Sequence, residues 1–60
     1  MKPKIGQVWQ EVDSRFSRFI EIVGFDNDLR VRIKNINNNR ITTARIDRFN
    51  EKHNGYKFIE

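Results

Sequence analysis

One hexapeptide constrains the fold more than any other part of this chain. In the segment LRVRIK, residues 29–34, apolar and cationic side chains alternate strictly. Alternation with a period of two predicts a β-strand that places one face in a core and the other in solvent. We therefore expect the apolar side chains of this segment to be buried, and its three cations, Arg30, Arg32 and Lys34, to be exposed.

Four other segments carry strand signals, so the sequence predicts an all-β protein. They contain β-branched and aromatic residues in partial alternation, and polar or glycine-containing stretches separate them. Gly24 interrupts one of them, which predicts a bulge or a close backbone approach. The five expected strands cover residues 5–12, 18–25, 29–34, 40–44 and 56–60.

Turn-forming residues and one helical turn connect these strands. DND at 26–28 predicts the turn of a hairpin between the second and third strands, since Asp and Asn favour turns. The asparagine-rich NINNN at 35–39 predicts the next turn, and NG at 54–55 predicts the last one. RIDRFN at 45–50 loses the alternation and is typical of a single helical turn. This order predicts one domain over residues 1–60, a small five-stranded SH3-like barrel that is closed or nearly closed.

The expected core consists of apolar side chains on the inner sides of these strands, together with aromatic residues. Its members are Val8, Trp9, Ile20, Ile22, Leu29, Val31, Ile33, Phe49 and Phe58. The register of the fourth strand has two interpretations. Strict alternation from an inward Ile41 would bury Arg45 without a partner, at a high cost in free energy. We expect a bulge near Thr42–Thr43 instead, which would place Ala44 and Ile46 inside.

The length and composition of the chain limit the class of protein. With 60 residues it forms one small domain, and such a domain buries only about 60% of the surface that its unfolded chain exposes. The chain has no cysteine, which excludes disulfides and fits a reducing compartment. It shows neither a targeting signal nor about 20 consecutive apolar residues, so we expect a cytoplasmic protein that does not enter a membrane.

Neither a catalytic nor a metal-binding pattern stands out. His53 is the only histidine, and a zinc site needs several converging ligands. Ser14 or Ser17 with Asp13 and His53 is a formal hydrolytic set, but Ser and Asp are ordinary turn residues. The three glycines are scattered and do not form a phosphate-binding loop. We therefore expect a binding module without a cofactor or metal, and not an enzyme.

The charge of the chain is compatible with a nucleic-acid partner. It has 12 Lys and Arg against 8 Asp and Glu, a net charge of +4, and an isoelectric point of about 10.0. An isoelectric point above about 9 is one sign of a nucleic-acid binder. Arg40 follows the asparagine-rich turn, so it should form one basic patch with the cations of 29–34. The alternative is a solvated face, on which Glu21 pairs with Arg30 or Arg32.

A second candidate surface lies in the loop between the first two strands. Phe16 stands there between Arg15 and Arg18, and neighbouring Arg and aromatic side chains can stack on unpaired bases. In a small barrel this loop would lie near the last strands, so Phe16 and Tyr56 could line one groove. The alternative is that Phe16 folds back over the end of the barrel.

Short motifs along most of the chain resemble those of one group of proteins. They are GQVW at 6–9, DSR at 13–15, Arg18 before an apolar strand, TARIDRF at 43–49 and GY at 55–56. Together they resemble a group of small uncharacterised bacterial and phage proteins with a GQVW, D-x-R, D-R-F and G-Y pattern. The resemblance implies a small SH3-like barrel of phage or prophage type, and it implies no particular activity.

The sequence favours a small basic module that binds nucleic acid with weak sequence specificity. Contacts from Lys and Arg to phosphates supply affinity without reading the base sequence. The residues expected at the interface are Arg15, Phe16, Arg18, Arg30, Arg32, Lys34 and Arg40. The alternative is a protein–protein adaptor, for example a phage accessory protein that docks on a host or phage complex.

Overall fold

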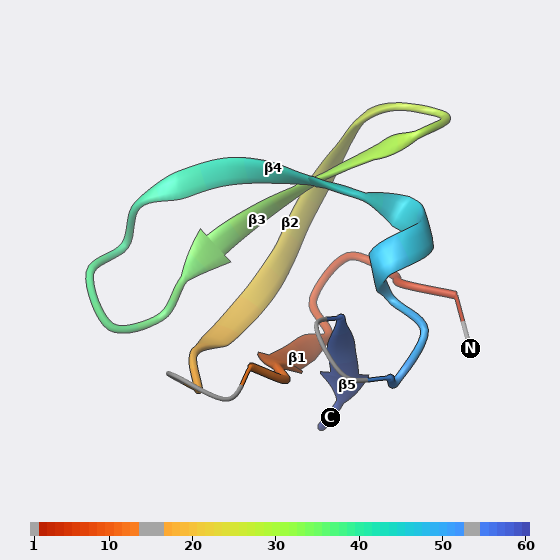
Figure 1. Cartoon of the computed structure of the whole chain (residues 1–60). Helices are drawn as coiled ribbons and strands as arrows, with labels where there is room; N and C mark the ends of the chain where they lie inside the picture. The colour runs from red at the N-terminus through yellow and green to blue at the C-terminus, as the bar shows by residue number, and fades with distance from the viewer. Residues whose placement is uncertain (1, 14–16, 53–54) are drawn as a thin grey trace.

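A computed structural model describes residues 2–13, 17–52 and 55–60 of the chain. Within these residues, five antiparallel strands form one sheet, and a short 3₁₀ helix precedes the last strand (Figure 1). The predicted all-β class, the five strands and the helical turn are therefore confirmed. The elements are β1 (Val8–Glu11), β2 (Phe19–Asn27), β3 (Arg30–Asn35), β4 (Ile41–Arg45), the 3₁₀ helix η1 (Ile46–Arg48) and β5 (Tyr56–Phe58).

The sheet is open. Its strand order is β4-β3-β2-β1-β5, so β1 lies between β2 and β5. β4 and β5 form the two edges, and no ladder joins them in the part of the chain that the structure describes. In Figure 1, β2, β3 and β4 form a long twisted ribbon, and β1 and β5 lie beneath it. The sheet is therefore not closed into a barrel.

Asparagine side chains build the two hairpin turns. Asn27 Oδ1 accepts hydrogen bonds from the backbone N–H groups two and three residues further on, at 2.8 and 3.1 Å. Asn35 and Asn38 accept the equivalent bond from the N–H two residues on in the β3–β4 turn, each at 2.9 Å. β2 continues through Asn27, so the first turn begins later than the predicted 26–28. The predicted turn at 54–55 falls partly outside the described residues.

The core is one apolar face centred on Trp9, whose side chain is 0% exposed. The rings of Phe49 and Phe58 meet Trp9 edge to face, with centroids 5.1 and 5.6 Å away. Such aromatic pairs contribute about 0.5–1.5 kcal/mol each beyond their buried area. The buried apolar residues are Trp9, Ile20, Ile22, Val31, Ile33, Ala44, Phe49 and Tyr56, and Ile46 and Phe58 pack partly buried against them.

Three members of the expected core are not fully buried. Leu29 is 67% exposed, because it lies in the turn before β3 and does not follow the alternation of that strand. Val8 is half-buried, because β1 directs Trp9 and Glu11 to the inner face instead. Phe58 is partly buried against the core. The prediction is therefore wrong for Leu29 and Val8, and it holds in part for Phe58.

β4 keeps a regular register, so the predicted bulge at 42–43 is wrong. Its ladder with β3 runs along the whole strand without a shift. Ala44 is buried and Ile46 packs against the core, as expected. The physical reason is that Ile41 points outward and is 58% exposed, so strict alternation also turns Arg45 outward.

The irregularities of the sheet lie in β2. The register with β3 shifts between Ile22 and Gly24 and again between Phe25 and Asn27. The first shift confirms the bulge predicted at Gly24. A Cβ added there would meet only the Cβ of Arg32, at 4.0 Å, so the backbone makes no close approach. Bulges increase the local twist of a strand, which accounts for the strong twist of the β2–β3 ribbon.

We expect Phe49→Ala to lower the free energy of unfolding by about 3–5 kcal/mol, because it opens a cavity beside Trp9. A core in a domain of this size supplies about the same amount in total, so the variant should be close to unfolded. Circular dichroism during urea unfolding measures the effect. The control is Leu29→Ala, which should stay within about 0.5 kcal/mol of the wild type. Equal losses in the two variants would contradict the assignment of the core.

Candidate anion-binding cleft

The structure separates the predicted cations onto two faces of the sheet. Arg30, Arg32 and Lys34 project from the outer face, opposite to the core. Arg40 pairs with Asn35, whose N–H donates to the Arg40 carbonyl at 2.8 Å, and this position belongs to the inner face. The expectation of a single basic patch is therefore wrong. Arg40 lies opposite Asn35, and Asn35 is one residue after Lys34, so strand alternation places Arg40 on the other face of the sheet.

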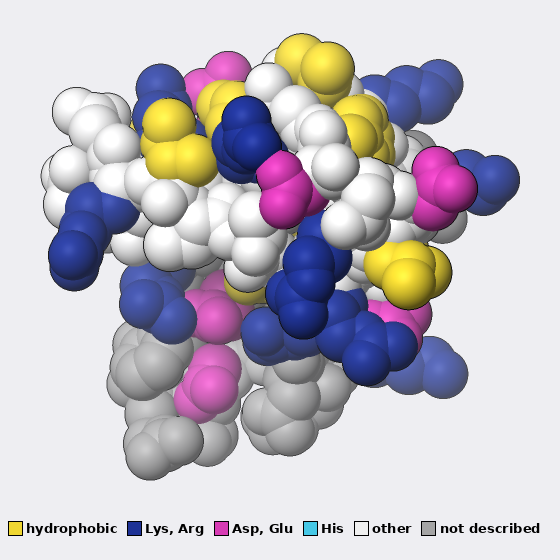
Figure 2. All heavy atoms as spheres, turned by 90° about the horizontal axis from the view of Figure 1, so that it is seen from above, with side chains coloured by type: hydrophobic (Ala, Val, Ile, Leu, Met, Phe, Trp, Pro, Cys, Tyr) yellow, Lys and Arg dark blue, Asp and Glu magenta, His cyan; other side chains and the backbone are white. Residues whose placement is uncertain are grey.

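Acidic neighbours neutralise much of the outer face. Arg32 pairs with Asp26 at 2.5 Å, and Lys34 pairs with Glu21 at 3.6 Å. Glu21 thus has a basic partner, as the solvated-face alternative requires, but that partner is neither Arg30 nor Arg32. In Figure 2, a view of the molecule from above, basic side chains lie beside acidic and hydrophobic ones.

The inner side of the sheet contains a cleft between the start of β4 and the strands β1 and β5. Its volume is about 380 Å³. Two of the predicted interface residues, Arg18 and Arg40, contribute to its walls. The lining residues are Glu11, Arg18, Ile20, Ile33, Asn35, Asn38, Arg40, Ile41, Thr42 and Tyr56.

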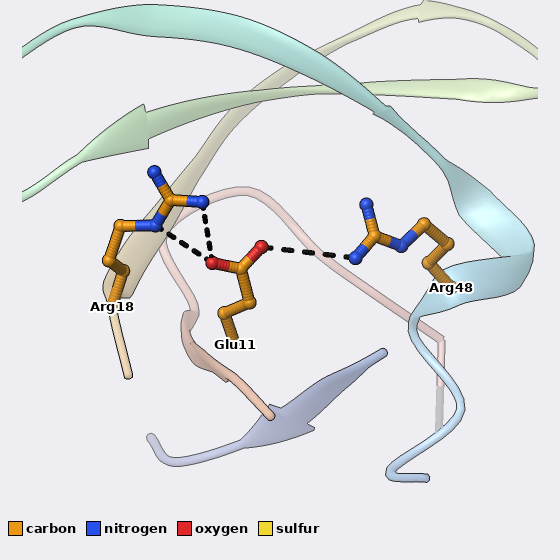
Figure 3. A network of polar contacts seen from close by, with 3 residues as sticks. All are labelled: Glu11, Arg18 and Arg48. Carbon is orange, nitrogen blue, oxygen red and sulfur yellow. Dashed lines mark hydrogen bonds and ion pairs between the residues drawn. The ribbon is translucent and has the colours of Figure 1, made fainter. Parts of the chain in front are cut away.

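Glu11 organises one wall of the cleft (Figure 3). Although charged, it is only 8% exposed. The guanidinium of Arg18 donates to Oε1, with Nε at 2.8 Å and a terminal nitrogen at 2.7 Å. The guanidinium of Arg48 lies 3.8 Å from Oε2, on the other side of the carboxylate. A buried carboxylate is stable only with such partners, so Glu11 fixes the positions of both arginines.

Sequence reasoning did not select Glu11 and Arg48. The signal for Glu11 is its spacing of two from Trp9, because strand alternation takes both to the same face. No comparable signal marks Arg48, which reaches Glu11 from η1, an element distant in the sequence.

Tyr56 also lines the cleft. Its ring stacks on Phe49, with centroids 4.7 Å apart and planes at 17°, and the guanidinium of Arg48 lies 5.0 Å from its centroid. Tyr56 is 4% exposed, so its ring is not available to stack on a base. Burial raises the pKa of its hydroxyl above the usual value, and Arg48 acts in the opposite direction. The expected groove partner, Phe16, lies outside the described residues, as does Arg15.

The opposite wall carries the cation Arg40. Arg40 is exposed, and none of the residues that the structure describes forms an ion pair with it. Arg18 and Arg40 both line the cleft, and Arg48 lies beside it on the carboxylate of Glu11. A cleft with an exposed guanidinium on its wall suits an anionic ligand such as a phosphate.

Other chemistry finds little support in the described residues. They contain no group of three or more His, Cys, Asp and Glu side chains that could hold a metal ion. In the formal hydrolytic set, His53 and Ser14 lie outside the described residues. Within those residues, no helix has the length and apolar character needed to cross a membrane.

Comparisons of the chain with protein-family models, with curated proteins and with solved structures find no match. The resemblance to small bacterial and phage proteins therefore stays a prediction.

We expect Glu11→Gln to lower the free energy of unfolding by about 1–3 kcal/mol, because two arginines lose a charged hydrogen-bond acceptor. Urea unfolding followed by the fluorescence of the single tryptophan measures the change. Glu21→Gln is the matched control, since it removes the same charge from a half-exposed pair 3.6 Å long and should cost about 1 kcal/mol or less. A larger loss in the control would show that Glu11 does not hold the cleft together.

The raised pKa of Tyr56 predicts a loss of stability in alkali. An unfolded tyrosine ionises near pH 10, and the folded one ionises at higher pH. The stabilisation is therefore complete below about pH 10 and is lost as pH rises through the folded pKa. We expect Tyr56→Phe to remove this part of the pH dependence. Tyr56 is the only tyrosine, so phenolate absorbance reads its pKa directly, and a value at or below about 10 would contradict the prediction.

Proposed function

We propose that the protein is a small nucleic-acid-binding module with weak sequence specificity, and that its main phosphate contacts lie in the cleft. The observation that carries the proposal is the guanidinium of Arg40, which forms no ion pair with any described residue and lies at a cleft whose other wall holds Arg18. Phosphate contacts of this kind dominate non-specific affinity. The arginines are exposed enough to reach a ligand, since the side chains of Arg18 and Arg48 are 47% and 41% accessible.

The outer face has a smaller part in this proposal. Arg32 and Lys34 already have carboxylate partners, so a phosphate would have to displace these partners before it gained a contact. Arg30 carries no ion pair within the described residues. It can therefore add one further phosphate contact at a distance from the cleft.

A single strand suits the cleft better than a duplex. A concave site of about 380 Å³ admits an extended phosphate backbone, whereas a rigid duplex presents a broad convex surface. Asn38 and Thr42 supply polar groups at the same wall, and such groups contact phosphate or sugar without reading a sequence. Weak specificity follows from this choice of contacts.

We also propose that the fold is related to SH3-like barrels of the phage or prophage type that the sequence motifs suggest. In this form of the fold the barrel stays open between β4 and β5. Five antiparallel strands with a 3₁₀ turn before the last one support this assignment. The absence of cysteine supports a cytoplasmic location. The fold alone would assign no function, because such small barrels serve many, and no part of the proposal involves catalysis.

A protein adaptor is the second candidate, and one observation favours it. Seven large hydrophobic side chains are exposed among the described residues, a large number for a chain of 60. Exposed apolar side chains that gather on one surface mark protein contacts. The seven are Ile5, Phe19, Phe25, Leu29, Ile36, Ile41 and Ile59.

Paired arginine substitutions test the nucleic-acid proposal. We expect Arg40→Ala to weaken binding to single-stranded DNA and RNA about equally across sequences, and to reduce the slope of log K against log salt by about 0.7. The matched control is Arg32→Ala, which removes the same charge from an ion-paired position and should change the slope less. Fluorescence anisotropy with labelled oligonucleotides at several salt concentrations measures both.

Two outcomes would reject the proposal. One is the absence of binding by the wild-type protein to single-stranded DNA and RNA even at about 50 mM salt, where phosphate contacts are strongest. The other is a larger effect of Arg32→Ala than of Arg40→Ala, which would move the contacts to the outer face. A duplex probe completes the series, and tighter binding to it would reject the preference for a single strand.

A further inference from the structure

The backbone of β4 has one unpaired side. In an antiparallel ladder, alternate residues direct both N–H and C=O toward the neighbouring strand, and the residues between them direct these groups away. At the two ends of the β3–β4 ladder, Asn35 N–H donates to Arg40 C=O and Ile46 N–H donates to Leu29 C=O, each at 2.8 Å. The β4 residues that direct their backbone groups toward the open edge are therefore Ile41, Thr43 and Arg45.

This edge lacks most of the features that block the addition of another strand. Natural edge strands usually carry a proline, a bulge or an inward-pointing charge, or another segment covers them. β4 reads ITTAR, with no proline, and its register against β3 has no shift. Every residue of β4 except Ala44 is exposed, and no strand of the described chain pairs with this edge.

Two arginines stand opposite each other at one end of the edge. Arg30 and Arg45 form a cross-strand pair on the outer face, and like charges in this position destabilise a sheet. Within the described residues, Arg45 forms an ion pair with Asp47 alone, at 3.1 Å, and both side chains are about two-thirds exposed, so solvent weakens it. A carboxylate on an added strand would lie beside Arg45 and relieve this repulsion.

The other end of the edge is apolar on the same face. Ile41 is 58% exposed, and its cross-strand neighbour Lys34 already has Glu21 as a partner. Positions opposite Arg45 and Ile41 on an added strand are four residues apart and project to one face. The edge therefore suits an extended segment with an acidic side chain at one position and an apolar side chain four residues away.

A second copy of this chain fits the edge less well. Each copy carries a net charge of +4, so association would bring two basic molecules together. A symmetric antiparallel pairing about Thr43 would place Arg45 of one copy beside Ile41 of the other. Neither arginine pair would then gain a carboxylate, and the repulsion between Arg30 and Arg45 would persist.

We propose that the free edge of β4 binds an extended acidic segment of a partner protein by strand addition, with a carboxylate at Arg45 and Arg30 and an apolar side chain at Ile41. Main-chain hydrogen bonds supply affinity in this binding mode, and alternate side chains supply specificity. The site shares Ile41 with the rim of the cleft, but its backbone groups and Arg45 lie outside the cleft, so strand addition does not require that the cleft binds nucleic acid.

A displayed library of random peptides, selected on the full chain, tests this site. We expect the selected peptides to be rich in acidic and β-branched residues. Thr43→Pro is the decisive variant, since Thr43 directs its N–H away from β3 and proline is tolerated at such edge positions. It removes one edge donor and leaves the β3–β4 ladder intact, so peptide affinity should fall about tenfold or more, the effect of losing about 1.4 kcal/mol.

Two further measurements keep the test independent of how well that variant folds. Arg45→Glu should weaken the same peptides to a similar degree, whereas Arg40→Ala, in the cleft, should leave them unchanged. In hydrogen exchange by NMR, a selected peptide should slow the amides of Ile41, Thr43 and Arg45. Thr42 and Ala44 already bond to β3, so their amides should change little.

Several results would overturn the proposal. They are a selection that yields no binder, peptides without acidic enrichment, or peptides that bind Thr43→Pro as well as the wild type. Slowed exchange at Thr42 and Ala44 instead of their neighbours would place the peptide elsewhere. Sedimentation that shows a wild-type dimer, lost in Thr43→Pro, would assign the edge to a second copy instead of an acidic partner.

Discussion

Burial of Trp9 is the constraint on which both the core and the cleft depend. β1 has four residues, and the inward turn of Trp9 also takes Glu11 inside, because alternate residues share a face. A carboxylate in that position needs cationic partners, and Arg18 and Arg48 come to it from two other parts of the chain. The basic character of the cleft is thus a consequence of how the largest aromatic side chain is packed.

Much of the fold could be predicted from local patterns. The alternation in 29–34 correctly placed Val31 and Ile33 inside and two arginines outside, because that segment is a regular strand from Arg30 onward. The prediction that Leu29 is buried failed for a local reason, since the side chain of Asn27 holds this residue in a turn. The open edges of the sheet could not be predicted, because closure depends on how strands distant in sequence are placed.

The candidate site was less accessible to sequence reasoning. Arg18 and Arg40 were selected for their charge, but their common place at one cleft follows from the strand order, which no local motif encodes. The ion pairs that neutralise Arg32 and Lys34 likewise depend on register between strands. Composition indicated that the chain carries excess positive charge, and only the three-dimensional arrangement distinguishes available cations from paired ones.

The position of β1 in the sheet also has a consequence for folding. The hairpins β2–β3 and β3–β4 join neighbours in sequence, so they can form from local contacts with little loss of chain entropy. β1 pairs with its neighbour β2 and also with β5, so that Trp9 lies opposite Phe58 from the other end of the chain. During synthesis on a ribosome, the side of Trp9 that Phe58 covers would stay open until β5 emerged. The slowest step of folding should therefore be the docking of β5 on β1, which closes the longest loop in the molecule.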